Sequence, residues 1–329
     1  MKQSPAERPD PTIQRKAAIV RGGVVDHAGN VRIEPKKNFN IDNTIFGTLE
    51  GTLPRFVMGR RMAKNIYFDA AIAKEIESKY EQIRAKVELP KVDAELITFL
   101  IEECDFDAEH AEGSFLDHLY FGFEYSVQHY PEHSPIVMLL HSILGTGTNT
   151  FAMEAHKIPA LKELITDFEW RHVEAFPSIL RLLYDGALRE ELSANTLRAS
   201  DIQEIRFHRV IDNAPITMSG EDFWIQMNYQ IMHVLDFLPA ANWAVHHSDN
   251  SFILFRSLYD IMTRSSQLQA NIQYTPPTGP RAFTREQADL GTRLIALAPE
   301  SVVDKMAGKS VRKFSERIGH SLAYQIVWK

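Results

Sequence analysis

The sequence has a single cysteine and no long apolar run. Cys104 cannot form a disulfide within the chain, which fits a reducing compartment. The apolar runs are far shorter than the roughly 20 residues that cross a bilayer, and the polar, proline-rich N-terminus lacks the apolar core of a signal peptide. We therefore expect a cytoplasmic protein with no membrane-spanning segment.

The chain also lacks an excess of basic charge. Its 36 lysines and arginines are outnumbered by 43 aspartates and glutamates, which gives a formal net charge of −7. Proteins that bind nucleic acids concentrate positive charge to neutralise phosphates, so we predict no nucleic-acid partner. With 44% apolar and 24% charged residues, the chain has the composition of a globular protein that buries a sizeable core.

Several common catalytic signatures are missing as well. The sequence contains no Gly-x-Ser-x-Gly elbow and no His-Glu-x-x-His motif. Gly308 begins a Gly-Lys-Ser triplet, but Val303 occupies the position where a phosphate-binding loop requires its first glycine. These absences argue against a serine hydrolase, a zinc peptidase and a P-loop nucleotide-binding protein.

Apolar residues recur with the 3.6-residue period of a helix along most of the chain. The pattern predicts helices, some of them broken, at 68–87, 93–103, 115–130, 136–144, 158–189, 221–245, 251–266, 285–297 and 299–327. We therefore expect a mainly α-helical fold. Its predicted parts are a disordered arm at 1–16, a turn-rich segment at 17–60, a helical core domain at 61–270 and a C-terminal helical appendage at 284–329.

Three local signals refine this outline. Apolar residues on both sides of the turn-like stretch 27–30 predict one short hairpin, and no larger sheet is indicated. Ser219 stands three residues before Asp222 and just ahead of an apolar run, which is the spacing of a capping box and predicts a helix start. Arg206 and His208 alternate as in an extended segment and would suit an anionic substrate.

The most informative stretches are HAEGSFLDHL at 110–119 and LLHSILGT at 139–146. His118 lies early in a predicted helix, with Gly122 one turn later removing bulk beside the imidazole. His141 closes an apolar helix just before a turn rich in glycine and threonine, where an imidazole can point into a pocket. On these residues alone, a pair of hydrogen-bonded structural histidines is the simpler explanation.

Residues 110 to about 240 resemble a degenerate member of the HD superfamily of helical metal-site proteins. That superfamily includes phosphohydrolases and di-iron oxygenases of the inositol-oxygenase type, and its pattern is a first histidine, a later His-Asp doublet and a closing helical aspartate. Here His118 matches the first histidine and His141 the histidine of the doublet. The sequence of both motifs, over 110–190, is also similar to that of an uncharacterised family of HD-like bacterial domains.

The resemblance implies a metal site, with one departure. Ser142 stands where the superfamily has its bridging aspartate, and a serine hydroxyl is a poor ligand for a hard divalent cation, so one metal is expected rather than two. The predicted helix at 221–245 is apolar almost all round and should be buried, so its polar residues need partners. Asp236, one turn after His233, lies near the place of the closing aspartate.

The predicted roles follow. The metal ligands are His118, His141, His233 and Asp236, and the metal is iron or manganese rather than zinc. The catalytic residues are His118, His141 and Asp117. The substrate-binding residues are Ser142, Thr146, Gln230 and His110. Two other groups are interpreted as solvated or superficial, namely His129 with His133 in a loop and Glu169 with His172 on a helix face.

The expected function is that of a small-molecule enzyme, an oxygenase or a hydrolase on an HD-like helical bundle. Two other classes stay open. One is a metal-free ligand-binding or scaffold module, which the loss of the bridging aspartate at Ser142 would produce. The other is metal-free acid–base catalysis by His118 or His141 with Asp117, which requires a histidine that titrates near neutral pH. A homodimer is expected because the predicted C-terminal helix, which ends near Trp328, could cover a partner.

Overall fold

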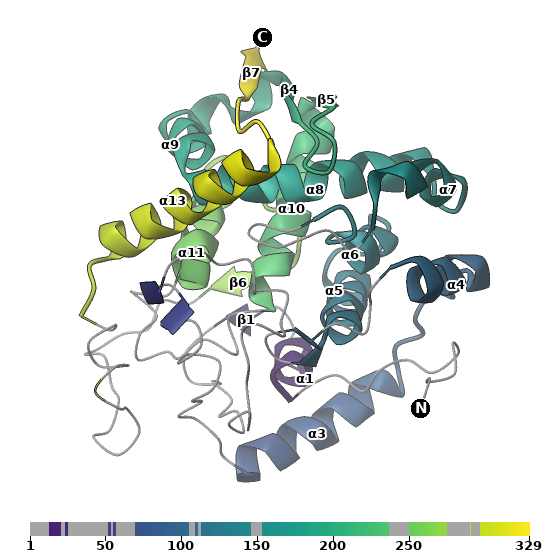
Figure 1. Ribbon diagram of the computed structural model, residues 1–329. Helices are drawn as coiled ribbons and strands as arrows, with labels where there is room; N and C mark the ends of the chain where they lie inside the picture. The colour runs from purple at the N-terminus through teal and green to yellow at the C-terminus, as the bar shows by residue number, and fades with distance from the viewer. Residues whose placement is uncertain are drawn as a thin grey trace.

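The computed structural model describes residues 13–20, 24–25, 52–53, 55–56, 70–104, 109–110, 113–145, 153–236, 250–274, 290 and 297–329. These residues are mainly helical, which confirms the predicted fold class (Figure 1). The longer helices are α3 (Ala70–Arg84), α4 (Ala94–Glu103), α5 (Phe115–His129), α8 (Asp167–Asp185), α10 (Gly220–Leu235), α11 (Asn250–Arg264) and α13 (Glu300–Ile318). The shorter ones are α1 (Ile13–Val20), α6 (Ile136–Leu140), α7 (Ile158–Glu163) and α9 (Ala187–Ala194).

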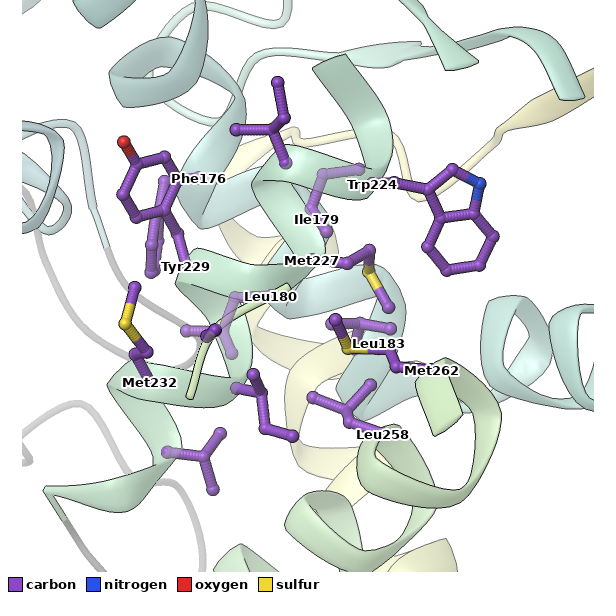
Figure 2. Packing of buried hydrophobic residues seen from close by; sticks show 14 of the residues in the cluster. Phe176, Ile179, Leu180, Leu183, Trp224, Met227, Tyr229, Met232, Leu258 and Met262 are labelled. Atoms are coloured by element: carbon purple, nitrogen blue, oxygen red, sulfur yellow. The ribbon is translucent and has the colours of Figure 1, made fainter. Parts of the chain in front are cut away.

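Helix α10 forms the centre of the core. It packs against α5, α6, α8 and α11, and nearly all of its residues are buried, as its apolar composition predicts (Figure 1). Figure 2 shows Leu183 of α8 close to Met227 of α10 and to Leu258 and Met262 of α11. Because α10 contacts four helices, its polar side chains face other helices rather than water.

Local capping fixes where the central helices begin. The Ser219 hydroxyl accepts a hydrogen bond from the backbone N–H of Asp222, which confirms the predicted helix start at α10. Helix α8 begins at a full capping box between Thr166 and Glu169. The Glu169 carboxylate also accepts a hydrogen bond from Ser134 and is buried, so the interpretation of Glu169 as a surface residue is wrong.

A three-stranded antiparallel sheet closes one end of the bundle, in the order β5 (Pro215–Ser219), β4 (Ile202–His208) and β7 (Gln325–Trp328). Strand β4 confirms the extended segment predicted around Arg206 and His208. Strand β7 contradicts the helix expected to continue to 327, because α13 ends at Gly319, whose φ of 73° is left-handed. Helix α13 packs on α8 and α11, so the predicted C-terminal appendage is in contact with two helices of the core.

The N-terminal part differs from its prediction. Residues 13–16 were expected in a disordered arm, but α1 begins at Ile13, and Arg15 and Lys16 are buried against the rest of the chain. Strand β1 (Val24–Val25) pairs in parallel with β6 (Gln273–Tyr274), whereas the other half of the predicted hairpin lies outside the described residues. Residues 1–12 and nearly all of the helix predicted at 285–297 also lie outside the described residues.

Two residue pairs, β2 (Glu109–His110) and β3 (Gly113–Ser114), form a short antiparallel ladder immediately before α5. This ladder contains the start of the first motif and leads directly into the helix that carries His118. None of the described helices has both the length and the apolar character required to cross a bilayer.

Candidate metal centre

Three buried histidines from three helical segments meet in the core. His118 lies in α5, His141 is the C-terminal cap of α6, and His233 lies in the last turn of α10. One ligand atom from each lies within 4.8 Å of the other two, an arrangement that could hold a metal ion. The Nε2 atoms of His118 and His141 are 2.9 Å apart, and the His233 ring centroid is 4.6 Å from that of His141.

A phenylalanine forms an apolar wall beside the cluster. The ring centroid of Phe176, from α8, lies 4.8 Å from that of His141 and 5.4 Å from that of His233. Phe176 is fully buried, and its carbonyl oxygen accepts a hydrogen bond from the Gln230 amide. The wall excludes water from one side of the histidines, which strengthens electrostatic interactions among them.

Gly122 allows α5 to approach α6 closely enough to bring His118 and His141 together. A Cβ at this position would lie 2.9 Å from Met138 Cε, 3.3 Å from Met138 Cβ and 3.4 Å from the Met138 carbonyl oxygen. That same carbonyl accepts the hydrogen bond from His141 Nδ1 at 2.7 Å. The glycine predicted to remove bulk beside His118 therefore makes room for the helix turn that orients His141.

We expect Gly122→Val to lower the free energy of unfolding by about 1–3 kcal/mol, since Met138 and the α6 backbone would have to move. Gly122→Ala should be much milder, because alanine gains about 1 kcal/mol of helix propensity over glycine and meets mainly the flexible end of Met138. Urea titration of both variants measures the difference. Equal stability of the valine and alanine variants would contradict a tight contact between the helices.

Asp236 contacts the nitrogen of His118 that faces away from the cluster. Its carboxylate lies 2.5 Å from His118 Nδ1 and accepts hydrogen bonds from Arg15 Nε at 2.8 Å and from a terminal Arg15 nitrogen at 3.2 Å. Arg15 and Asp236 are 1% and 4% exposed, so the ion pair is shielded from water. A carboxylate that holds the far nitrogen of a metal-binding histidine is a recurrent device in metal sites.

These outer partners fix which ring nitrogens carry protons. The Met138 carbonyl can only accept, so His141 Nδ1 must donate. Asp236 accepts from Arg15 with both oxygens, so His118 Nδ1 is the donor to it. In the neutral imidazoles, both Nε2 atoms then present lone pairs to each other across 2.9 Å. Such a contact repels unless a proton or a metal cation lies between the nitrogens.

Burial disfavours a second proton on either imidazole. Desolvation lowers the pKa of the His141 imidazole from 6.5 to about 4, and Asp236 and the Met138 hydrogen bond oppose this only in part. Desolvation also holds the pKa of His118 well below its usual range, with smaller contributions from the charges of His141 and Arg15. Both rings are therefore neutral near pH 7, which is the state that binds metals.

The donor set fits a divalent ion. Two imidazole nitrogens about 2.1 Å from one ion lie about 3 Å apart when they meet it at a right angle, close to the 2.9 Å between His118 and His141. Neutral imidazole nitrogen suits zinc, copper, iron and nickel. The cluster has the ligand type, the burial and the supporting hydrogen bonds that a metal centre requires, and His118, His141 and His233 could hold an ion.

The structure brings some of the predicted residues together and separates others. His118, His141 and His233 are the predicted ligands that form the cluster, whereas Asp236 is not among the grouped ligand atoms and contacts His118 from behind. Ser142 is buried in the turn that follows His141. Thr146 lies outside the described residues, as do the side chains of His110 and Asp117.

Protein-family models, curated proteins and solved structures show no match to this chain. The likeness to the HD superfamily therefore stays a prediction from the two motifs.

Arg15 and Phe176 contribute to the site without having been predicted from the sequence. Arg15 lies outside both motifs, in the short amphipathic segment 13–20. Two other histidines were interpreted from the sequence as solvated or superficial, and this interpretation is wrong. His129 is buried beside Tyr125, and His172 is fully buried and hydrogen-bonded to Gln226, so neither is a solvated surface residue.

Proposed function

We propose that the His118–His141–His233 cluster binds one divalent metal ion and that the protein is a small-molecule enzyme built around it. The observation that carries the proposal is the 2.9 Å contact between the Nε2 atoms of His118 and His141. Both rings are oriented by outer acceptors so that these lone pairs converge. A cation removes the repulsion and satisfies both nitrogens, which gives metal binding a specific physical reason.

The ligand set bears on the choice of metal. The sequence predicted iron or manganese and Asp236 as a carboxylate ligand, but Asp236 contacts the outer nitrogen of His118 instead. Three imidazoles favour iron or zinc over manganese. We keep both metals in the proposal, because imidazole nitrogen suits iron and zinc alike.

The proposed reaction is an oxidation or a hydrolysis of a small molecule. A bound ion would supply redox chemistry if it is iron, or Lewis-acid activation if it is zinc. The protein's own side chains would bind the substrate and exclude water. Phe176 keeps one side of the cluster apolar. Gln230 lies one turn before His233, and its Oε1 atom is a buried acceptor without a hydrogen-bond partner among the described residues, which suits a substrate donor.

Metal-free acid–base catalysis receives less support. That function requires a histidine that gains and loses a proton near pH 7. Burial lowers the pKa of both His118 and His141, and for His141 to about 4. A metal-free ligand-binding module is the alternative that the experiment below separates from the proposal.

The test is elemental analysis of protein purified without chelator or affinity metal, before and after anaerobic reconstitution with iron(II), zinc and manganese(II). About one ion per chain is expected, with iron or zinc retained through gel filtration and manganese lost. A thermal melt should show stabilisation by the retained ion, because a ligand that binds only the folded state raises its stability.

Absence of a bound ion under all three conditions would overturn the metal centre. The buried histidines would then belong to a metal-free pocket. The same preparation can be examined by ligand screening for a small molecule that raises the melting temperature.

A further inference from the structure

The outer support of the cluster comes from a distant part of the chain. Arg15 is 221 residues away from Asp236 in sequence and lies on α1, whereas the cluster is built by α5, α6 and α10. Figure 1 shows α1 lying between α3 and the end of α5, and α1 packs against both helices. The N-terminal helix therefore closes the hydrogen-bonded chain that runs from Arg15 through Asp236 to His118.

Each link in this chain depends on the one before it. The guanidinium donates two hydrogen bonds to the Asp236 carboxylate, a fork geometry that fixes the carboxylate plane as well as its charge. The oriented carboxylate accepts from His118 Nδ1 and so directs Nε2 toward His141. A buried carboxylate without this cation would be costly to keep charged, so the chain needs α1 in place.

We propose that Arg15 is a positioning residue for the metal centre and that docking of α1 and binding of the metal ion are thermodynamically coupled through Asp236. This inference rests on the proposed function, since it concerns the same ion. A cation on His118 Nε2 withdraws electrons from the ring and makes Nδ1–H a stronger donor to Asp236. The strengthened carboxylate bond in turn holds Arg15, and with it α1.

Coupling of this kind acts in both directions. If docked α1 increases the affinity for the ion, the ion must favour docked α1 by the same factor. Outer partners of metal ligands typically contribute 10- to 100-fold in metal affinity. Removal of Arg15 should therefore weaken metal binding by roughly that factor, and the ion should protect the backbone amides of α1 from hydrogen exchange.

The chain offers a matched control on the same helix. Lys16 is a second buried cation of α1, but its ammonium group pairs at 2.9 Å with Glu77 of α3 and not with Asp236. Lys16→Met removes a buried cation with its contacts to Glu77 and the Tyr80 ring, while leaving the Arg15–Asp236 pair intact. A general loosening of α1 would affect both variants, whereas the proposed chain depends on Arg15.

The experiment compares the full-length parent with Arg15→Met, Arg15→Lys and Lys16→Met. Zinc affinity is measured by competition with a chromogenic chelator, and hydrogen exchange of residues 13–20 is followed by mass spectrometry with and without zinc. We expect Arg15→Met to bind zinc about 10- to 100-fold more weakly, with no zinc-dependent protection of α1. Arg15→Lys should be intermediate, because it keeps the charge but loses the fork. Lys16→Met should stay close to the parent and keep the protection.

The outcomes separate this inference from the proposed function. A parent that binds zinc and an Arg15→Met variant that binds it equally well would overturn the positioning role while leaving the metal centre intact. Equal losses in Arg15→Met and Lys16→Met would overturn it too, because they indicate general loosening. A parent that binds no ion would overturn both. If Arg15→Met does not fold, as judged by circular dichroism, the Arg15→Lys variant carries the comparison.

Discussion

The His141→Ala variant should bind iron or zinc at least 100-fold more weakly than the parent, a loss greater than the roughly 10- to 100-fold effect of removing an outer partner. His141 contributes an Nε2 lone pair that the Met138 carbonyl orients from the other side of the ring. Among the described residues, the group of candidate ligands contains no side chain besides His118, His141 and His233 that could replace that nitrogen. Equilibrium dialysis followed by elemental analysis measures the residual affinity.

The control for this variant is His320→Ala. His320 is also a buried histidine whose ring donates to a backbone carbonyl, in this case that of His208, but it follows α13 and lies outside the cluster. Its variant should keep the metal content of the parent although it loses a similar volume from the interior. Retention of a full equivalent of metal by His141→Ala would show that the ion is held elsewhere.

The sequence pointed to the three histidines of the candidate centre because local patterns carry that information. His118 and His141 were visible from two motifs, and His233 from the helix that is apolar almost all round. A helix that is apolar on every side must be buried, so its polar residues must face one another or a ligand. That requirement indicated a buried partner for His233, which the structure places beside His118 and His141.

The sequence could not distinguish a ligand from the residue that orients a ligand. Asp236 lies one turn after His233, so spacing alone places both at the site. Its role depends on Arg15, which binds both carboxylate oxygens from a helix more than 200 positions away. No local period reports such a contact, and the polar, proline-rich start of the chain favoured a disordered arm instead.

The C-terminal strand was missed for a similar reason. Residues 322–328 continue an apolar pattern that is compatible with a helix, yet β7 pairs with β4, whose register places Ile326 opposite Ile205. The left-handed Gly319 ends α13 and was the local signal for a change of direction. Trp328 packs beneath the Arg198 guanidinium, 5.1 Å from its ring centroid, so it has a contact within its own chain. The argument for a homodimer from this residue is thereby weakened.

The Asp236→Leu variant should lose about 3 kcal/mol of unfolding free energy in metal-free protein, the largest stability effect that we expect from a single substitution. Asp236 and Arg15 form a buried ion pair, and removal of one partner from such a pair leaves a charge in a poorly solvating environment. His118 loses the acceptor of its Nδ1 proton at the same time. Urea denaturation in the presence of a chelator measures the loss apart from any contribution of the ion.

The double variant Asp236→Leu/Arg15→Met decides whether the loss comes from the buried charge. If it does, removal of Arg15 as well should recover a large part of the stability, because apolar side chains can replace a buried ion pair at little cost. Asp260→Ala, which breaks an exposed ion pair with Arg264, should leave stability nearly unchanged. Additive losses in the double variant would mean that the two residues act independently, and the hydrogen-bonded chain from α1 to His118 would then not operate as a unit.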